Sequence, residues 1–145
     1  MNMNMKFYHK TPIQIRFNDV DIVGHVNNSV YQNYFDVARM RYFEEVFGRK
    51  LDWDNKLLVL VKIEIEYFQA VDMYDDIFVL TKVDKLGNKS LHMEQRLTGK
   101  ENTDVRCLNR AVLSGYDYDT KQSVPLLDEW RTSIKKYEKD IDFSG

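Results

Sequence analysis

Alternation of apolar and polar residues dominates this chain and predicts most of its secondary structure. Residues 57–68 alternate in a way that is typical of a strand with one buried face. Lys62, Glu64 and Glu66 lie on one side of the pattern, and the apolar side consists of Val59, Val61, Ile63, Ile65 and Tyr67. Similar segments recur along the chain. We therefore predict five strands, at residues 11–17, 57–68, 76–85, 89–98 and 105–118. Because short polar turns such as Gly87-Asn88 separate the last four, we expect these four to form an antiparallel meander.

Two other segments have the spacing of helices. After a polar loop at residues 19–28, apolar residues recur at steps of three and four until Gly48, a typical helix stop. This apolar stripe comprises Tyr31, Phe35, Ala38, Tyr42 and Val46. Asn28 or Ser29 is expected to cap the helix start. Asp128 signals the start of a shorter amphipathic helix. Its apolar face is expected to comprise Trp130, Ile134, Tyr137 and Ile141.

The order of these elements predicts an α+β fold. The long helix is apolar around much of its girth, so other structure must cover it, and the simplest cover is one sheet curled around it. At 145 residues, the chain is expected to form a single domain, residues 1–145, with one core.

Composition indicates which kinds of binding partner and which cellular compartment to expect. The formal net charge is −2, and Lys and Arg are scattered along the chain, so we expect no nucleic-acid binding. Residues 1–10 lack the apolar core of a signal peptide, and we expect no membrane insertion. The single cysteine, Cys107, excludes an internal disulfide and fits a reduced cytoplasm. Its place in an alternating segment predicts a packed apolar side chain.

The segment at residues 16–41 carries the candidate chemistry. Asp21 precedes the long helix by a few residues. At a helix start, unpaired backbone N–H groups and the positive end of the helix dipole can stabilise developing negative charge. A carboxylate beside such an oxyanion site is suited to acyl transfer. The alternative for Asp21 is a carboxylate that only bonds loop backbone, and Asp19 is expected to brace the loop.

The motif Asp-x-x-Gly-His-Val-Asn-Asn at residues 21–28 resembles that of the hotdog-fold acyl-CoA thioesterases, in particular the 4-hydroxybenzoyl-CoA thioesterase type. Arg-Phe-Asn-Asp precedes it at residues 16–19, and it is followed by Tyr31, Tyr34, Phe35 and Arg39. The likeness covers almost the whole chain. It implies the hotdog fold, a five-stranded antiparallel sheet wrapped around a long central helix, with a short C-terminal helix.

The resemblance also implies catalytic roles. The aspartate of the motif is the family's catalytic carboxylate, here Asp21, which acts as general base or as nucleophile. The family's oxyanion donor, a backbone N–H at the first turn of the central helix, corresponds to the backbone of Asn28 or of a residue beside it. His25 also resembles the histidine of the plant-type acyl-carrier-protein thioesterases, whose motif has Asn two residues earlier, where this chain has Val23. His25 either orients Asp21 or a water molecule, or is a polar loop residue.

For substrate binding, we assign Gly24 and Tyr31, although Tyr31 is also expected to pack in the core or at a subunit contact. Lys89 and Ser90 resemble the family position near the pantetheine arm. No cofactor is expected, since coenzyme A is part of the substrate. No metal is expected either, because metal-ligand spacing is lacking at His9, His25 and His92.

The leading hypothesis is a cytoplasmic acyl-CoA thioesterase. An acyl-carrier-protein thioesterase is the first alternative, and a non-catalytic protein that binds acyl thioesters is the second. A dehydratase is more distant. We expect a homodimer or homotetramer, with two sheets joined edge to edge.

Overall fold

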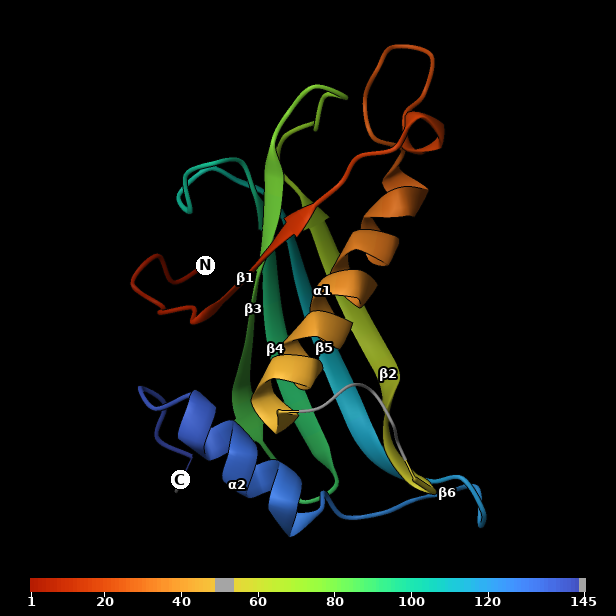
Figure 1. Ribbon diagram of the computed structural model, residues 1–145, viewed down its shortest axis with the longest axis vertical. Helices are drawn as coiled ribbons and strands as arrows, with labels where there is room; N and C mark the ends of the chain where they lie inside the picture. Colours follow the sequence, from red (N-terminus) through yellow and green to blue (C-terminus); the bar gives the residue numbers. More distant parts are fainter. Residues whose placement is uncertain (49–53, 144–145) are drawn as a thin grey trace.

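A long helix, α1 (Tyr31–Phe47), lies along the concave side of a curled antiparallel sheet (Figure 1). The computed structural model describes residues 1–48 and 54–143. The strands are β1 (His9–Ile13), β2 (Lys56–Tyr67), β3 (Ile77–Leu86), β4 (Ser90–Thr98), β5 (Val105–Asp117) and the added short β6 (Gln122–Ser123). A second helix, α2 (Asp128–Tyr137), packs near the end of α1. The expected α+β hotdog architecture is confirmed.

The strand order differs from the expected meander in one respect. The sheet runs β1-β3-β4-β5-β2, with β6 paired to β5. The meander prediction is confirmed for β3, β4 and β5 but was wrong for β2, which pairs with β5. The connection at residues 68–76 is too long for a tight hairpin, so it does not force neighbouring strands to pair. Instead it bonds to the loop before α1, where the Val26 N–H donates to the Val71 C=O at 2.8 Å.

The first strand is shorter than its alternation predicted. Strand β1 ends at Ile13, and Phe17–Asp19 forms a 3₁₀ turn, η1, so the predicted strand at residues 11–17 was wrong beyond Ile13. The Asp19 carboxylate accepts the Arg16 N–H at 2.9 Å, and the Asp19 N–H donates to the Arg16 C=O at 2.9 Å. Such local bonds satisfy backbone groups that a longer strand would have paired with a neighbour.

Helix α1 begins after a single 3₁₀ turn, η2 (Asn28–Val30). Asn27 caps this turn, since its Oδ1 accepts the Ser29 N–H at 3.4 Å, and α1 itself begins after Val30 without a side-chain cap. The predicted cap at Asn28 or Ser29 was therefore wrong. The helix ends at Gly48, as predicted. Gly48 adopts a φ of 67°, a left-handed conformation that glycine tolerates and that terminates helices.

The core lies between α1 and the concave face of the sheet. The fully buried side chains on this face of the helix are Phe35, Ala38 and Tyr42. They belong to clusters with inward-facing apolar residues of β3, β4 and β5. Cys107 is part of this core, which confirms its predicted packing, and burial raises the pKa of its thiol to about 12. The thiol is therefore neutral and unreactive at physiological pH.

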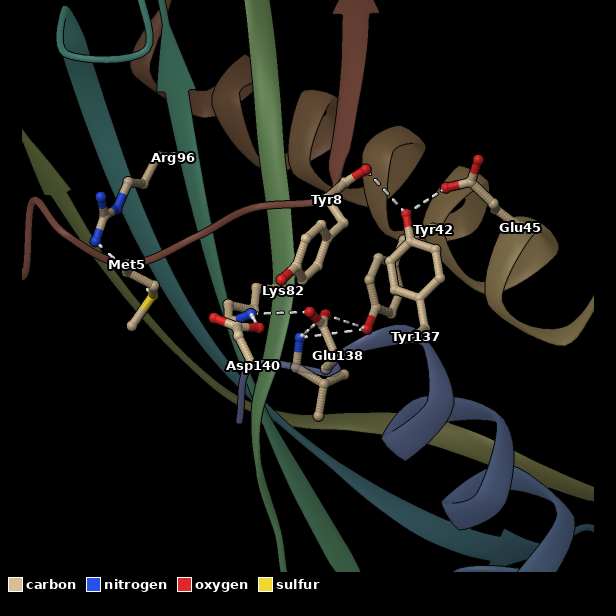
Figure 2. Close-up of polar contacts among 10 residues, drawn as sticks. Met5, Tyr8, Tyr42, Glu45, Lys82, Arg96, Tyr137, Glu138 and Asp140 are labelled. Carbon is tan, nitrogen blue, oxygen red and sulfur yellow. Dashed lines mark hydrogen bonds and ion pairs between the residues drawn. The ribbon is translucent and has the colours of Figure 1, made fainter. Parts of the chain in front are cut away.

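A buried ion pair connects β3 to the segment that follows α2 (Figure 2). Lys82 Nζ lies 2.9 Å from Glu138 Oε1, and both side chains are fully buried. Asp140 Oδ1 also lies 2.9 Å from Lys82 Nζ. Glu138 Oε2 accepts the Tyr42 hydroxyl at 2.7 Å and the Val83 N–H at 3.1 Å. One carboxylate therefore holds β3, α1 and the C-terminal segment together.

The same contacts explain why α2 ends early. Helix α2 stops at Tyr137, so the prediction that Ile141 lies on its apolar face was wrong. Glu138 leaves the helical conformation, with φ −89° and ψ 59°. Strand β1 begins opposite Thr81, so the Val83 N–H lies beyond the strand that would otherwise cover this edge of β3. The Glu138 carboxylate supplies an acceptor there.

Replacing Lys82 with Met is expected to leave the Glu138 carboxylate buried without its cation, at a cost of about 3–5 kcal/mol in the free energy of unfolding. The double variant Lys82→Met/Glu138→Gln removes the uncompensated charge and is expected to recover part of this loss. Urea unfolding followed by circular dichroism measures both. As a control, Lys62→Met removes an exposed Lys–Glu pair and is expected to cost less than about 1 kcal/mol. Equal losses for Lys82→Met and Lys62→Met would contradict the structural role of the buried pair.

Candidate functional site

The loop that carries the motif closes on itself before α1 begins. The Asp21 N–H donates to the His25 C=O at 2.9 Å, and the Gly24 N–H donates to the Asp21 C=O at 3.0 Å. Gly24 adopts a φ of 83°, which L side chains rarely adopt. This backbone conformation explains why the motif has glycine at position 24, because another residue would strain the turn that presents Asp21.

Asp19 holds this loop at both ends. Its carboxylate accepts the Arg16 N–H at 2.9 Å and the Tyr34 hydroxyl, from α1, at 2.7 Å. Its C=O accepts the Asn27 N–H at 2.8 Å. Burial opposes ionisation of Asp19, but these hydrogen bonds and the Arg16 charge outweigh burial and hold the pKa of Asp19 below its usual value. The predicted bracing role of Asp19 agrees with these contacts.

A cavity of about 410 Å³ lies beside the loop, between the start of α1 and the end of β2. The loop and η2 contribute Asp21, His25, Val26, Asn27 and Asn28, and α1 contributes Tyr31. The other wall comprises Tyr67, Phe68, Gln69 and Ala70. The loop side of the cavity is therefore mostly polar, and its aromatic rings come from Tyr31 on α1 and from Tyr67 and Phe68 on the other wall.

The Asp21 carboxylate uses one oxygen to support the loop. Its Oδ1 accepts the N–H groups of Val23 and His25, each at 3.1 Å. Its Oδ2 has no hydrogen-bond partner within residues 1–48 and 54–143. Asp21 is thus both a loop-bonding carboxylate and a cavity residue with one oxygen available to a ligand or to water.

The helix start offers a backbone donor to the same cavity. The Asn27 C=O accepts the Val30 N–H at 2.9 Å, and the Ser29 N–H donates to the Asn27 side chain. The Asn28 N–H has no acceptor in the described part of the chain. An unpaired N–H at the start of a helical turn, in the same cavity as a carboxylate, can stabilise an oxyanion while the carboxylate acts on a nucleophile.

Comparison with known proteins identifies the family. A model of the thioesterase-like superfamily matches residues 15–134, most of the chain. The chain belongs to this superfamily. A thioesterase of Thermus thermophilus, solved in complex with coenzyme A and zinc, is similar with a TM-score of 0.80 and 29% identity, over 92% of this chain and 96% of that one. A predicted thioesterase of Bacillus stearothermophilus is similar with a TM-score of 0.80 and 25% identity, over 94% and 98% of the two chains.

A curated relative adds little on activity. The uncharacterised protein YsmA of Bacillus subtilis (strain 168) is 27% identical over 90 residues, which are 61% of this chain and 58% of that protein. The match thus spans less than two thirds of the relative's length. The family and the fold therefore support thioester hydrolysis in general, and the substrate depends on the site itself.

The structure brings most of the predicted site residues together. Asp21, His25, Asn28 and Tyr31 all line the cavity, and Tyr31 is also buried in the core, as expected. Gly24 shapes the turn beside them and does not itself line the cavity. Within this thioesterase-like chain, the motif thus forms one continuous site.

Lys89 and Ser90 lie elsewhere. They follow the turn between β3 and β4, near α2, at the end of the sheet away from the motif loop (Figure 1). Neither residue lines the cavity that contains Asp21. Their assignment to the pantetheine arm therefore stays a prediction, and within one chain they are separate from the motif.

The second wall of the cavity escaped sequence reasoning. Tyr67, Phe68, Gln69 and Ala70 come from the end of β2 and the connection after it. Alternation predicted that residues near 67 belong to a strand, but it gives no information on which loop that strand end meets. The exposure of Phe68, half of its surface, is a signal that becomes visible in the tertiary structure.

Other features of the described residues give no competing site. A larger cavity of about 780 Å³ lies between β1 and α1, and Asp19 lines it but none of the predicted catalytic residues does. Within residues 1–48 and 54–143, no cluster of three His, Cys, Asp or Glu side chains could hold a metal ion. Neither helix in that part of the chain has the length and apolar character needed to cross a membrane.

Asp19→Asn is expected to lower the free energy of unfolding by about 1–3 kcal/mol at pH 7, because the buried negative charge that strengthens the hydrogen bonds from Arg16 and Tyr34 is lost. The pKa of Asp19 is lowered in the folded state, so this stabilisation is full above the usual aspartate pKa of about 3.9 and is lost as the pH falls through the lowered pKa. Urea unfolding of the wild type and the variant at pH 7 and pH 3 measures the difference. The exposed Asp76→Asn serves as control. A gap between wild type and Asp19→Asn that grows on acidification would contradict this account.

Proposed function

We propose that the chain hydrolyses acyl-CoA thioesters, with Asp21 and the Asn28 N–H as its catalytic groups. The observation that carries the proposal is that one cavity is lined by both Asp21 and Asn28. Among the described residues, one carboxylate oxygen of Asp21 and the backbone N–H of Asn28 have no partner. Similarity to the Thermus thermophilus thioesterase, which was solved with coenzyme A, supports coenzyme A as the carrier.

The reaction needs few groups because a thiolate leaves readily near neutral pH. In the proposed mechanism, the Asn28 N–H donates to the thioester oxygen as negative charge develops there. Asp21 either removes a proton from water, which attacks the carbonyl carbon, or attacks that carbon itself to form an anhydride that water then opens. In both routes the C–S bond breaks, coenzyme A leaves as the thiol, and the acid is released.

His25 has a secondary place in this proposal. Its backbone N–H bonds Asp21 Oδ1, which orients the carboxylate. Its ring belongs to a residue that lines the same cavity, so it can bind water or the substrate there. An acyl carrier protein is the alternative carrier, and a cytoplasmic location is part of the same proposal.

Asp21→Asn is expected to lower kcat/KM by at least about 100-fold, the usual scale for loss of a general base. Asparagine retains an oxygen that can accept the Val23 and His25 N–H groups, so the loop is expected to keep its conformation. The measurement is thiol release from a panel of acyl-CoA esters, repeated with one acyl chain on an acyl carrier protein.

The matched control is Asp119→Asn, which changes an exposed aspartate outside the cavity. It is expected to keep wild-type turnover. Wild-type turnover by Asp21→Asn would refute the role of Asp21. Binding of a non-hydrolysable analogue by wild type, with no turnover of any ester, would favour the non-catalytic alternative.

We also propose that two copies pair through β2. This strand pairs with β5 on one side, and in the described part of the chain no strand covers its other side. Val61 and Ile63 on β2 are 59% and 40% exposed. An open strand edge with apolar side chains is a typical site for pairing with a second copy, and this edge adjoins the cavity through Tyr67. A homotetramer requires a further contact.

The double variant Val61→Lys/Ile63→Lys is expected to shift the chain toward monomer, because it places like charges on both edges of the proposed interface. Analytical ultracentrifugation measures the oligomeric state. Val37→Lys, on α1 and 43% exposed, is the control. Dissociation by Val37→Lys alone would place the dimer contact on α1 and contradict pairing through β2.

A further inference from the structure

We infer that Tyr67 is a positioning residue for the oxyanion site: its hydroxyl fixes the backbone of Asn28 so that the Asn28 N–H points at the reacting carbonyl. This inference rests on the proposed thioester hydrolysis. It adds a residue from the far side of the cavity that neither the motif nor the family comparison indicates.

Tyr67 reaches across the cavity from the end of β2. Its hydroxyl donates to the Asn28 C=O at 3.2 Å. Its ring packs edge-on against Tyr31, the first residue of α1, with centroids 5.2 Å apart and planes at 81°. Burial raises the pKa of Tyr67 above its usual value, so the hydroxyl is protonated at neutral pH and can donate.

The hydrogen bond from Tyr67 reaches the turn η2, which is only weakly stabilised by its own hydrogen bonds. The turn η2 is one 3₁₀ turn of three residues, and such turns have poor hydrogen-bond geometry. Because a peptide unit is planar, the Val30 N–H on the Asn27 C=O fixes the plane that contains the Asn28 N–H. The Tyr67 hydroxyl fixes the next plane, which contains the Asn28 C=O. Asn28 is thus held on both sides.

No other side chain from outside the loop and turn donates to the backbone of η2 within the described residues. The Asn27 side chain does bond Ser29, but Asn27 belongs to the same loop and moves with it. Tyr67 instead ties the turn to the sheet, which is the rigid part of the fold. Its loss should therefore loosen the donor and leave the cavity walls in place.

The test compares Tyr67→Phe with Tyr67→Leu, using the acyl-CoA ester that wild type hydrolyses fastest. Tyr67→Phe keeps the ring and removes the hydrogen bond. We expect kcat to fall about 10-fold, less than the 100- to 1,000-fold typical of losing an oxyanion donor, with KM changed less than twofold. Tyr67→Leu also removes the wall and is expected to raise KM in addition.

A second readout separates positioning from packing. The probes are a trifluoromethyl ketone analogue of the acyl-CoA, whose hydrate mimics the tetrahedral intermediate, and the matching S-alkyl-coenzyme A, which lacks the carbonyl. Tyr67→Phe is expected to bind the ketone about 10-fold more weakly and the S-alkyl compound as wild type does. Tyr118→Phe, an exposed tyrosine that does not line the cavity, is the control and should change neither affinity.

The results of these measurements support or contradict the positioning role of Tyr67. Unchanged kcat in Tyr67→Phe, with a loss in Tyr67→Leu, would show that the ring matters and the hydroxyl does not. An equal loss of affinity for both probes, or a lowered thermal midpoint that accounts for the loss of activity, would reduce Tyr67 to packing. Absence of turnover by wild type would instead overturn the proposed function, and the role of Tyr67 with it.

Discussion

The burial of α1 against the concave face of the sheet is the constraint on which the rest of the structure depends. The fully buried face of this helix leaves little freedom in where it lies. Because α1 is fixed, its first residue, Tyr31, is fixed too, and the turn η2 and the motif loop must end there. The packing of the core therefore fixes the position of the candidate site, although the reactive atoms of the site lie at the surface end of the helix.

Two tyrosines of α1 each attach the helix to another segment through a hydrogen bond to a buried carboxylate. Tyr34 donates to the Asp19 carboxylate and Tyr42, about two turns further, donates to the Glu138 carboxylate, each at 2.7 Å. Both carboxylates are buried and bonded by backbone N–H groups as well. A carboxylate in such surroundings is costly unless its bonds are complete. The helix is thus attached at one point to the motif loop and at another to the C-terminal segment.

The site itself differs from these anchors in what it leaves unpaired. At Glu138 both carboxylate oxygens accept hydrogen bonds. At Asp19, Oδ2 accepts two hydrogen bonds and Oδ1 lies 3.6 Å from the Arg16 guanidinium, and these contacts suit a structural role. At Asp21 one oxygen is occupied and the other has no partner among the described residues, and the nearby Asn28 N–H is in the same condition. Unpaired polar groups of residues that line a cavity are available to a ligand, and this difference separates the candidate catalytic carboxylate from the bracing ones.

The amino-acid sequence by itself determined the order of the elements, the long central helix with its stop at Gly48, the buried Cys107 and the motif around Asp21. These follow from periodicity, from local backbone preference and from a motif contained in one short segment. Three contacts were decided by the tertiary structure alone. Strand β2 pairs with β5, Glu138 forms an ion pair with Lys82 where α2 ends, and the Tyr67 hydroxyl donates to the Asn28 C=O. Each of these contacts joins residues far apart along the chain. No local pattern contains them, because they depend on how the packed helix and the curled sheet bring distant backbone and side-chain groups within bonding distance.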